Sequence, residues 1–169
     1  MGGLTRLRLA DKPTTEVHTW IDAAPKSVWR LVSDITLMPA LSDELYAVEW
    51  VPPATGPGLG AAFRGCNRRG DTQWSTVSYI VDYKPVRVFA WAVNHLTKPG
   101  AIWRFTLQPD REGTVLNQWV QIGPGQSGVS TAIQAHPDSE QDILVSRLRE
   151  FDQGMEHNLA VIKAIAETT

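Results

Sequence analysis

The middle of the chain is a run of short segments divided by turn residues, and this feature limits the fold more than any other. Proline, glycine and charged residues interrupt the sequence repeatedly between Leu45 and Ile122. The pieces between these breaks are six predicted strands, at residues 45–51, 61–68, 72–83, 86–93, 101–108 and 114–122. Their connections are short enough for hairpins. The sequence therefore predicts an antiparallel meander.

A long amphipathic helix follows the predicted strands. A short apolar stretch at residues 129–135 ends at His136-Pro137, and Asp138 with Gln141 has the spacing of a capping box. The helix is expected to run to about Glu167, with an apolar stripe made of Leu144, Leu148, Phe151, Met155, Leu159 and Ile162. Its other face carries charged residues, among them Arg147 and Glu150, and is expected in solvent. Only one side of this helix can be buried.

The N-terminal part of the chain adds one strand and two short helices. Residues 14–21 alternate between apolar and polar, which predicts a half-buried strand. Residues 25–32 form a first helix, since Pro25 suits an initial helical turn. A brief second helix, capped by Asp34 or Thr36, ends near Leu41. Residues 1–13 are expected to be a flexible tail, and residues 14–167 a single domain.

These elements have one economical packing. We predict an α+β helix-grip fold, in which a curved seven-stranded antiparallel sheet wraps around the long C-terminal helix, with two short helices after the first strand. A bent sheet around a helix leaves volume between them, and side chains or a ligand must fill it. The seven tryptophans are about three times the ordinary proportion for a chain of this length. We therefore expect aromatic walls around that volume.

Charge, hydropathy and cysteine content argue against several kinds of partner and site. With 18 acidic and 16 basic residues and a net charge of -2, the chain lacks the basic field that nucleic acids attract. No apolar run is long enough for membrane insertion. Cys66 is the only cysteine, so no internal disulfide can form, and we expect a cytoplasmic protein. The four histidines lack metal-ligand spacing, so we expect neither metal nor cofactor. A homodimer is left open.

Several local motifs resemble one superfamily. In residues 22–29, a small residue and a proline come before Val28-Trp29. The other motifs are two predicted strand segments, residues 85–91 and 103–109, and the hairpin residues Gly113-Thr114. In this order, they make residues 14–167 resemble the START-like superfamily, also called SRPBCC or helix-grip and including birch-pollen-allergen-like proteins. The closer likeness is to its bacterial polyketide cyclase/dehydrase-like branch. The resemblance implies a hydrophobic ligand, although this fold hosts carriers, receptors and cyclases alike.

Strand alternation predicts which side chains face the cavity. In each strand we take the phase richer in large apolar residues as inward. We therefore expect side chains of the sheet, of the two short helices and of the final helix to contact the ligand. These residues are Trp29, Met38, Leu41, Phe63, Asn67, Trp74, Thr76, Ser78, Phe89, Trp91, Trp103, Phe105, Gln118, Met155 and Leu159. The phase stays open in residues 72–83, where Val77, Tyr79 and Val81 compete, and in residues 86–93. The aromatic residues also fit a plain packed core.

Three polar residues are candidates for chemistry. Asn67 and Gln118 face an apolar interior, so each must bond a neighbour, a water or a ligand oxygen. His95 could act as a general acid or base, or could be a hairpin-end residue in solvent. No strong acid-base pair falls in the inward phase. Binding of a polyketide-like, aromatic or lipid-like molecule is the first hypothesis, and a polyketide aromatase/cyclase or dehydratase is the alternative.

A third hypothesis concerns the outer surface. A protein-interaction module would need a broad apolar patch outside the cavity. Trp20, Tyr46, Trp50 and Trp119 could supply one if all four point outward.

Overall fold

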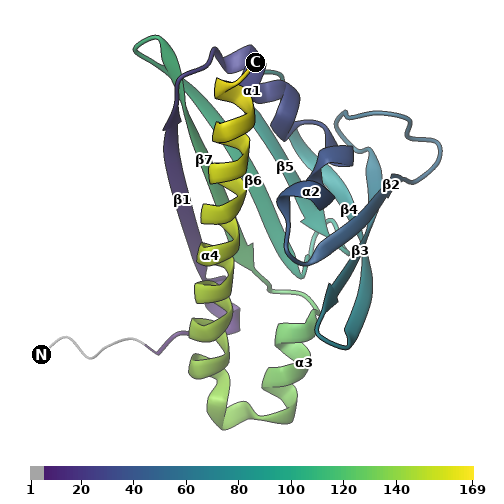
Figure 1. Ribbon diagram of the computed structural model, residues 1–169. Coiled ribbons are helices and arrows are strands. Elements are labelled where there is room, and N and C mark those ends of the chain that lie inside the picture. Colours follow the sequence, from purple (N-terminus) through teal and green to yellow (C-terminus); the bar gives the residue numbers. More distant parts are fainter. Residues whose placement is uncertain (1–5) are drawn as a thin grey trace, which may run out of the picture.

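The sheet has the topology that the sequence predicts. The computed structural model describes residues 6–169 and contains one seven-stranded antiparallel sheet in the order β1-β7-β6-β5-β4-β3-β2 (Figure 1). Its strands are β1 (Thr14–Ile21), β2 (Leu45–Trp50), β3 (Ala62–Arg69), β4 (Thr72–Lys84), β5 (Val88–Val93), β6 (Ala101–Asp110) and β7 (Gly113–Ile122). Strands β2 to β7 form the meander, and β1 pairs with β7. The predicted meander is confirmed.

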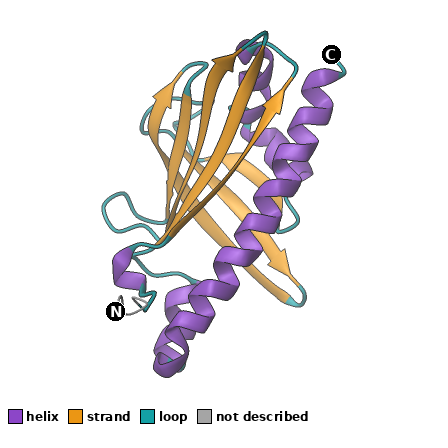
Figure 2. Ribbon diagram, turned by 90° about the vertical axis from the view of Figure 1, so that its left-hand side faces the viewer, coloured by secondary structure: helices purple, strands orange, loops and turns teal. Residues whose placement is uncertain are grey.

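The helices cover one face of this sheet. They are α1 (Pro25–Val32), α2 (Met38–Leu41), α3 (Gly128–Ala135) and α4 (Glu140–Glu167), with single 3-10 turns η1 (Leu9–Asp11), η2 (Ile35–Leu37) and η3 (Pro137–Ser139). Figure 2 shows α4 running obliquely along the curved sheet. Helix α4 packs on β1 and β7, and also contacts α1, α2 and α3. This arrangement confirms the helix-grip fold.

The start of α4 differs from the prediction. The predicted capping box of Asp138 and Gln141 is wrong, because Asp138 lies in a 3-10 turn that begins at Pro137. The N-cap of α4 is Ser139, whose side chain makes no capping hydrogen bond. Glu140 instead accepts a hydrogen bond from the backbone N–H of Leu9 at 2.9 Å. Of the tail expected over residues 1–13, residues 1–5 lie outside the described part, and η1 is tied to α4 by this bond.

A β-bulge decides the phase of β4. The register shifts between Ile80 and Asp82, so the chain gains one residue against β5. Before the bulge, Ser78 and Ile80 are buried, whereas Val81 in the bulge is exposed. This confirms the inward phase that we chose for Ser78 and Ile80. After the bulge Tyr83 pairs with Phe89 and its ring joins the core.

The C-terminal end of α4 is tied to the sheet by a carboxylate. Glu167 accepts hydrogen bonds from Nζ of Lys163 at 2.8 Å and from the backbone N–H of Asp22 at 2.9 Å. The bond from Lys163, followed by that from Asp22, lowers the pKa of Glu167. A lowered pKa adds stability above the ordinary pKa of glutamate, and this stability is lost as the pH falls through the lowered value.

We expect Glu167→Gln to remove that pH dependence. The variant should be less stable than the wild type at neutral pH, and the difference should shrink below about pH 4. Urea unfolding at several pH values measures this. Glu112 is the control, since its exposed side chain makes no hydrogen bond within residues 6–169, and Glu112→Gln should leave the pH profile of the wild type unchanged.

Candidate functional site

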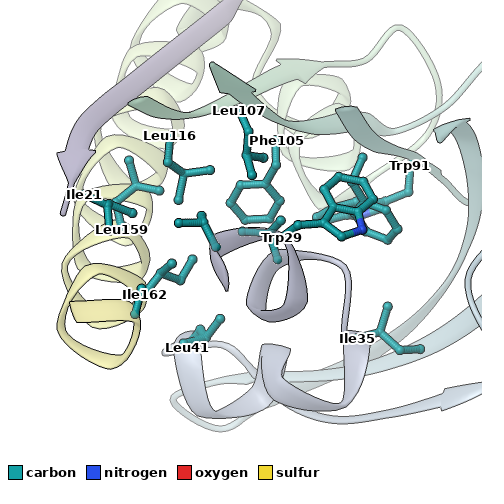
Figure 3. Close-up of a cluster of buried hydrophobic side chains, with 14 of the residues drawn as sticks. Ile21, Trp29, Ile35, Leu41, Trp91, Phe105, Leu107, Leu116, Leu159 and Ile162 are labelled. Carbon is teal, nitrogen blue, oxygen red and sulfur yellow. The ribbon is translucent and has the colours of Figure 1, made fainter. Parts of the chain in front are cut away.

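One half of the inner face of the sheet is a closely packed aromatic cluster. Phe89 is fully buried, and its ring centroid lies 5.4 Å from Trp91, 6.1 Å from Tyr83 and 6.3 Å from Trp29. Phe105 extends the cluster through Trp91, at 6.1 Å. Figure 3 shows Trp29 reaching from α1 toward Trp91 and Phe105. These rings pack on one another in tilted and edge-on contacts, which is how aromatic cores are stabilised.

The other half of the inner face is covered less tightly. Asn67, Trp74, Thr76 and Trp103 all point inward by register, and all are only partly buried. Trp103 meets helix α4 through Phe151, at a centroid distance of 4.9 Å. We call this region the open half. It lies toward the β3–β4 hairpin, whereas the aromatic cluster lies toward α1.

The helical residues that we expect at the ligand lie at different depths. Met155 and Leu159 of α4 are 1% and 2% exposed and belong to the core beneath that helix. Trp29 and Leu41 are also buried, and Met38 packs against the core while partly exposed. Phe63 on β3 is buried against Trp50 and Trp91. The structure thus places most of the predicted contacts in the packed cluster, and a smaller set in the open half.

Gln118 links the sheet to helix α4. Its side chain is 3% exposed, and its Oε1 accepts a hydrogen bond from Nδ2 of Asn158 at 3.4 Å. The Asn158 amide fits better turned over, since its nitrogen then donates to the carbonyl oxygens of Leu41 and Gly154. In either orientation the two amides face one another. Turning the Asn158 amide gives up its hydrogen bond to Gln118, so Asn158 satisfies the buried amide of Gln118 in only one of the two orientations.

The remaining inward polar groups lie on β3 and β4. Asn67, Thr76 and Ser78 make no side-chain hydrogen bond within residues 6–169, although Ser78 is only 3% exposed. Thr76 lies opposite Gly65, and Asn67 lies opposite Trp74. A β-carbon built on Gly65 would lie 3.8 Å from Oγ1 of Thr76, which places that hydroxyl beside the glycine. These three groups form a polar strip in the open half.

His95 lies apart from Asn67 and Gln118. It is exposed in the loop between β5 and β6, where its Nδ1 accepts from the backbone N–H groups of Thr97 at 3.2 Å and Lys98 at 3.0 Å. Two donors at Nδ1 place the ring proton of the neutral form on Nε2. The three candidates for chemistry are thus not gathered at one point.

Sequence reasoning missed a group of four charged residues beside the open half. Arg147 was expected in solvent and is instead 16% exposed, paired with Glu44 at 2.9 Å and Glu150 at 2.6 Å. Burial works to lower the pKa of Arg147, but hydrogen bonds and attraction from Glu44 and Glu150 outweigh it and raise the pKa. Arg69 of β3 also pairs with Glu150, at 2.9 Å. Only the Arg147–Glu150 spacing of three, typical of a helical ion pair, signalled part of this group.

The prediction that Trp50 belongs to an outer aromatic patch is wrong. Strand β2 bulges between Leu45 and Ala47, so Tyr46 and Trp50 fall on opposite faces despite their even spacing. Trp50 packs against Phe63, whereas Tyr46 lies under Arg68, with 5.0 Å from the guanidinium carbon to the ring centroid.

The other two outer aromatic residues are also covered by cations. Trp119 lies 4.2 Å from the guanidinium of Arg104, and Trp20 lies 4.7 Å from that of Arg111. Trp20 and Trp119 are near the β1 edge of the sheet, and Tyr46 is on the opposite edge strand. A broad apolar patch is therefore not formed by these residues.

Two pockets open on the surface of the described residues. One, of about 350 Å³, is lined by residues 51–54 and 59–62. The other, of about 610 Å³, is lined by Ala24, Pro25, Lys26, Val86, Arg87 and Pro109. Neither contains a residue that we predict to contact a ligand.

Within residues 6–169, three or more histidine, cysteine, aspartate or glutamate side chains do not gather into a metal-binding group. No helix in the same range has the length and apolar character needed to cross a membrane.

Comparison with solved structures finds the same fold. A polyketide-cyclase-like protein from Corynebacterium glutamicum, solved by NMR, is 31% identical over 90% of each chain, with a TM-score of 0.64. The Zhui aromatase/cyclase from a Streptomyces species is 16% identical over 92% of this chain and 93% of its own, with a TM-score of 0.65. The di-domain ARO/CYC StfQ of the steffimycin biosynthetic pathway is 17% identical over 92% of this chain and 50% of its own, with a TM-score of 0.70.

The sequence comparisons give the family. Curated protein sequences showed no significant match to the chain. The model of a family described as polyketide cyclase / dehydrase and lipid transport matches residues 12–149. That range includes all seven strands and both short helices after β1. The chain therefore belongs to the polyketide cyclase/dehydrase and lipid transport family, within the START-like superfamily that its sequence resembles.

Proposed function

We propose that this protein binds a small, flat hydrophobic molecule between the open half of the sheet and helix α4. The observation that carries the proposal is the partial exposure of Trp74 and Trp103, two large aromatic side chains that point inward. Apolar surface that faces the interior without being fully covered gains free energy when a ligand covers it. Membership in a family described as polyketide cyclase / dehydrase and lipid transport supports binding of a hydrophobic ligand.

The polar strip would orient such a ligand. Asn67, Thr76 and Ser78 offer an amide and two hydroxyls along one side of the open half, while Trp103 and Phe151 offer ring faces and edges on the other. Binding sites of this kind are mostly apolar with a few placed polar groups. The ligand class is therefore an aromatic or polyketide-like molecule with oxygen atoms along one edge.

Binding can be tested with a neutral fluorescent dye. Prodan is a flat naphthalene with a carbonyl oxygen, and its emission moves to shorter wavelengths in an apolar site. About 17 heavy atoms at roughly 0.3–0.4 kcal/mol each give an expected Kd of about 10–200 μM. Titration should show one saturable site and a blue shift. Absence of saturation up to about 1 mM would reject the binding proposal.

Cyclisation of a bound polyketide is a second candidate function. It is favoured by the family and by the buried amide of Gln118, which lies opposite Phe105 of the aromatic cluster. An amide can hydrogen-bond a substrate carbonyl, and a shaped cavity can hold a reactive chain in a folded form. Asn67 could act on a second carbonyl, and His95 could move protons only if its loop turned inward.

The enzyme candidate predicts product formation from a poly-β-keto thioester. Wild-type protein should raise the yield of one cyclised product over buffer, and Gln118→Ala should lower that yield by about tenfold. The yields from Asn67→Ala and His95→Ala test whether Asn67 or His95 also takes part in the reaction. Equal yields from buffer, wild type and all variants would leave binding as the only function at this site.

A further inference from the structure

Four charged side chains join three elements beside the open half. Glu44 follows α2, Arg69 ends β3 at its hairpin with β4, and Arg147 and Glu150 belong to α4. Arg147 pairs with Glu44 and Glu150, and Arg69 pairs with Glu150 at 2.9 Å and Glu44 at 3.5 Å. We call this group the charge clasp. It ties the β3–β4 hairpin and the α2–β2 loop to α4 through ion pairs between side chains.

The clasp lies directly on the aromatic residues of the proposed site. The guanidinium of Arg147 is 4.3 Å from the ring centroid of Phe151, which in turn contacts Trp103. The guanidinium of Arg69 is 5.9 Å from the ring centroid of Trp74. Each arginine therefore covers one aromatic wall of the open half while it bonds the two carboxylates.

The clasp is built to open more easily than the fold around it. The side chains of Arg69, Glu150 and Glu44 are 55%, 46% and 30% exposed, and exposed ion pairs contribute little stability and are screened by salt. Arg69 of the hairpin pairs with Glu150 of α4 at 2.9 Å, so loss of this pair removes a direct link between the hairpin and α4. Arg147, which is mostly buried, can keep its bond to Glu44 while Arg69 is released.

We propose that the charge clasp controls passage of the ligand into the open half, with release of Arg69 as the opening step. This inference rests on the proposed binding function. Closed, the clasp holds the hairpin against α4 and keeps Trp74 and Phe151 covered by guanidinium groups. Open, it frees the hairpin tip and uncovers Trp74, while Arg147 stays over Phe151. Such a step sets rates of entry and exit without adding contacts to the bound ligand.

Stopped-flow binding of prodan tests the clasp. In Arg69→Gln we expect the association and dissociation rates both to rise by about tenfold, with Kd changed by less than about twofold, because a barrier common to both directions is lowered. Arg69→Lys keeps the charge and should restore rates near those of the wild type. Raising the salt concentration should accelerate binding to the wild type and leave Arg69→Gln unchanged.

A matched control uses another ion pair. Arg64 pairs with Glu49 at 3.1 Å on the same hairpin strand but on the outer face, and Arg64→Gln should leave both rates unchanged. Equal rates in wild type and Arg69→Gln would overturn the clasp and leave ligand binding intact. A change in Kd with an unchanged association rate would make Arg69 a binding contact instead. If prodan fails to bind the wild type, the proposed function fails and the clasp fails with it.

Discussion

Replacing Phe89 by alanine should lower the free energy of unfolding by about 3–5 kcal/mol, which is the cost of removing a buried aromatic ring from a core. Phe89 is fully buried and is the only ring in the aromatic cluster of residues 6–169 that contacts Trp29, Tyr83 and Trp91 together. The cavity left by its ring would border α1 and two strands. Since a domain of this size is stable by about 5–15 kcal/mol, the variant would be close to unfolding.

Urea unfolding followed by circular dichroism measures this loss. Val81 is the control, because it is 36% exposed in the bulge of β4, and Val81→Ala should cost less than about 1 kcal/mol. Phe89→Leu should lose less than Phe89→Ala and should bind prodan like the wild type. A loss below about 1 kcal/mol in Phe89→Ala would mean that this ring is a ligand platform and not core.

The fold could be predicted closely because its turns are marked in the sequence. Proline and glycine interrupt each strand boundary, and the observed strands end within two residues of the expected positions. Side-chain phase was harder. A bulge inserts one residue without any sign in the alternation, so Tyr83 moves into the core and Trp50 moves away from Tyr46.

The charge clasp could not be predicted for a different reason. Its partners are distant in sequence: Glu44 and Arg147 are separated by 103 residues, and Arg69 and Glu150 by 81. Each of the four side chains reads as a solvent residue in its own segment, one in a turn, one at a hairpin tip and two on a helix face. Only the packing of α4 across the sheet brings them together. The same packing divides the aromatic residues into a core and an open half, although alternation treats all of them as inward.

Filling the open half should abolish ligand binding while the fold is kept. Thr76 points inward on β4 opposite Gly65, and Thr76→Trp would place an indole where we propose that the ligand lies. We expect prodan affinity to fall by at least about a hundredfold, equivalent to about 2.7 kcal/mol, because the dye and the indole compete for one volume. Thr76 is only partly buried, so a larger side chain can be accommodated toward solvent with less strain than in the packed cluster.

Ser75 provides the matched control for this prediction. It is the preceding residue on the same strand, it is exposed and its side chain points to the other face of the sheet, so Ser75→Trp adds the same indole outside the site. Prodan should bind Ser75→Trp with the affinity of the wild type. If both variants bind alike, the dye lies elsewhere, and the pocket of about 610 Å³ beside Lys26 and Arg87 becomes the next place to block. If only Thr76→Trp fails, the site is fixed to the inner face near β4, because the two variants differ only in which face of the sheet carries the new ring.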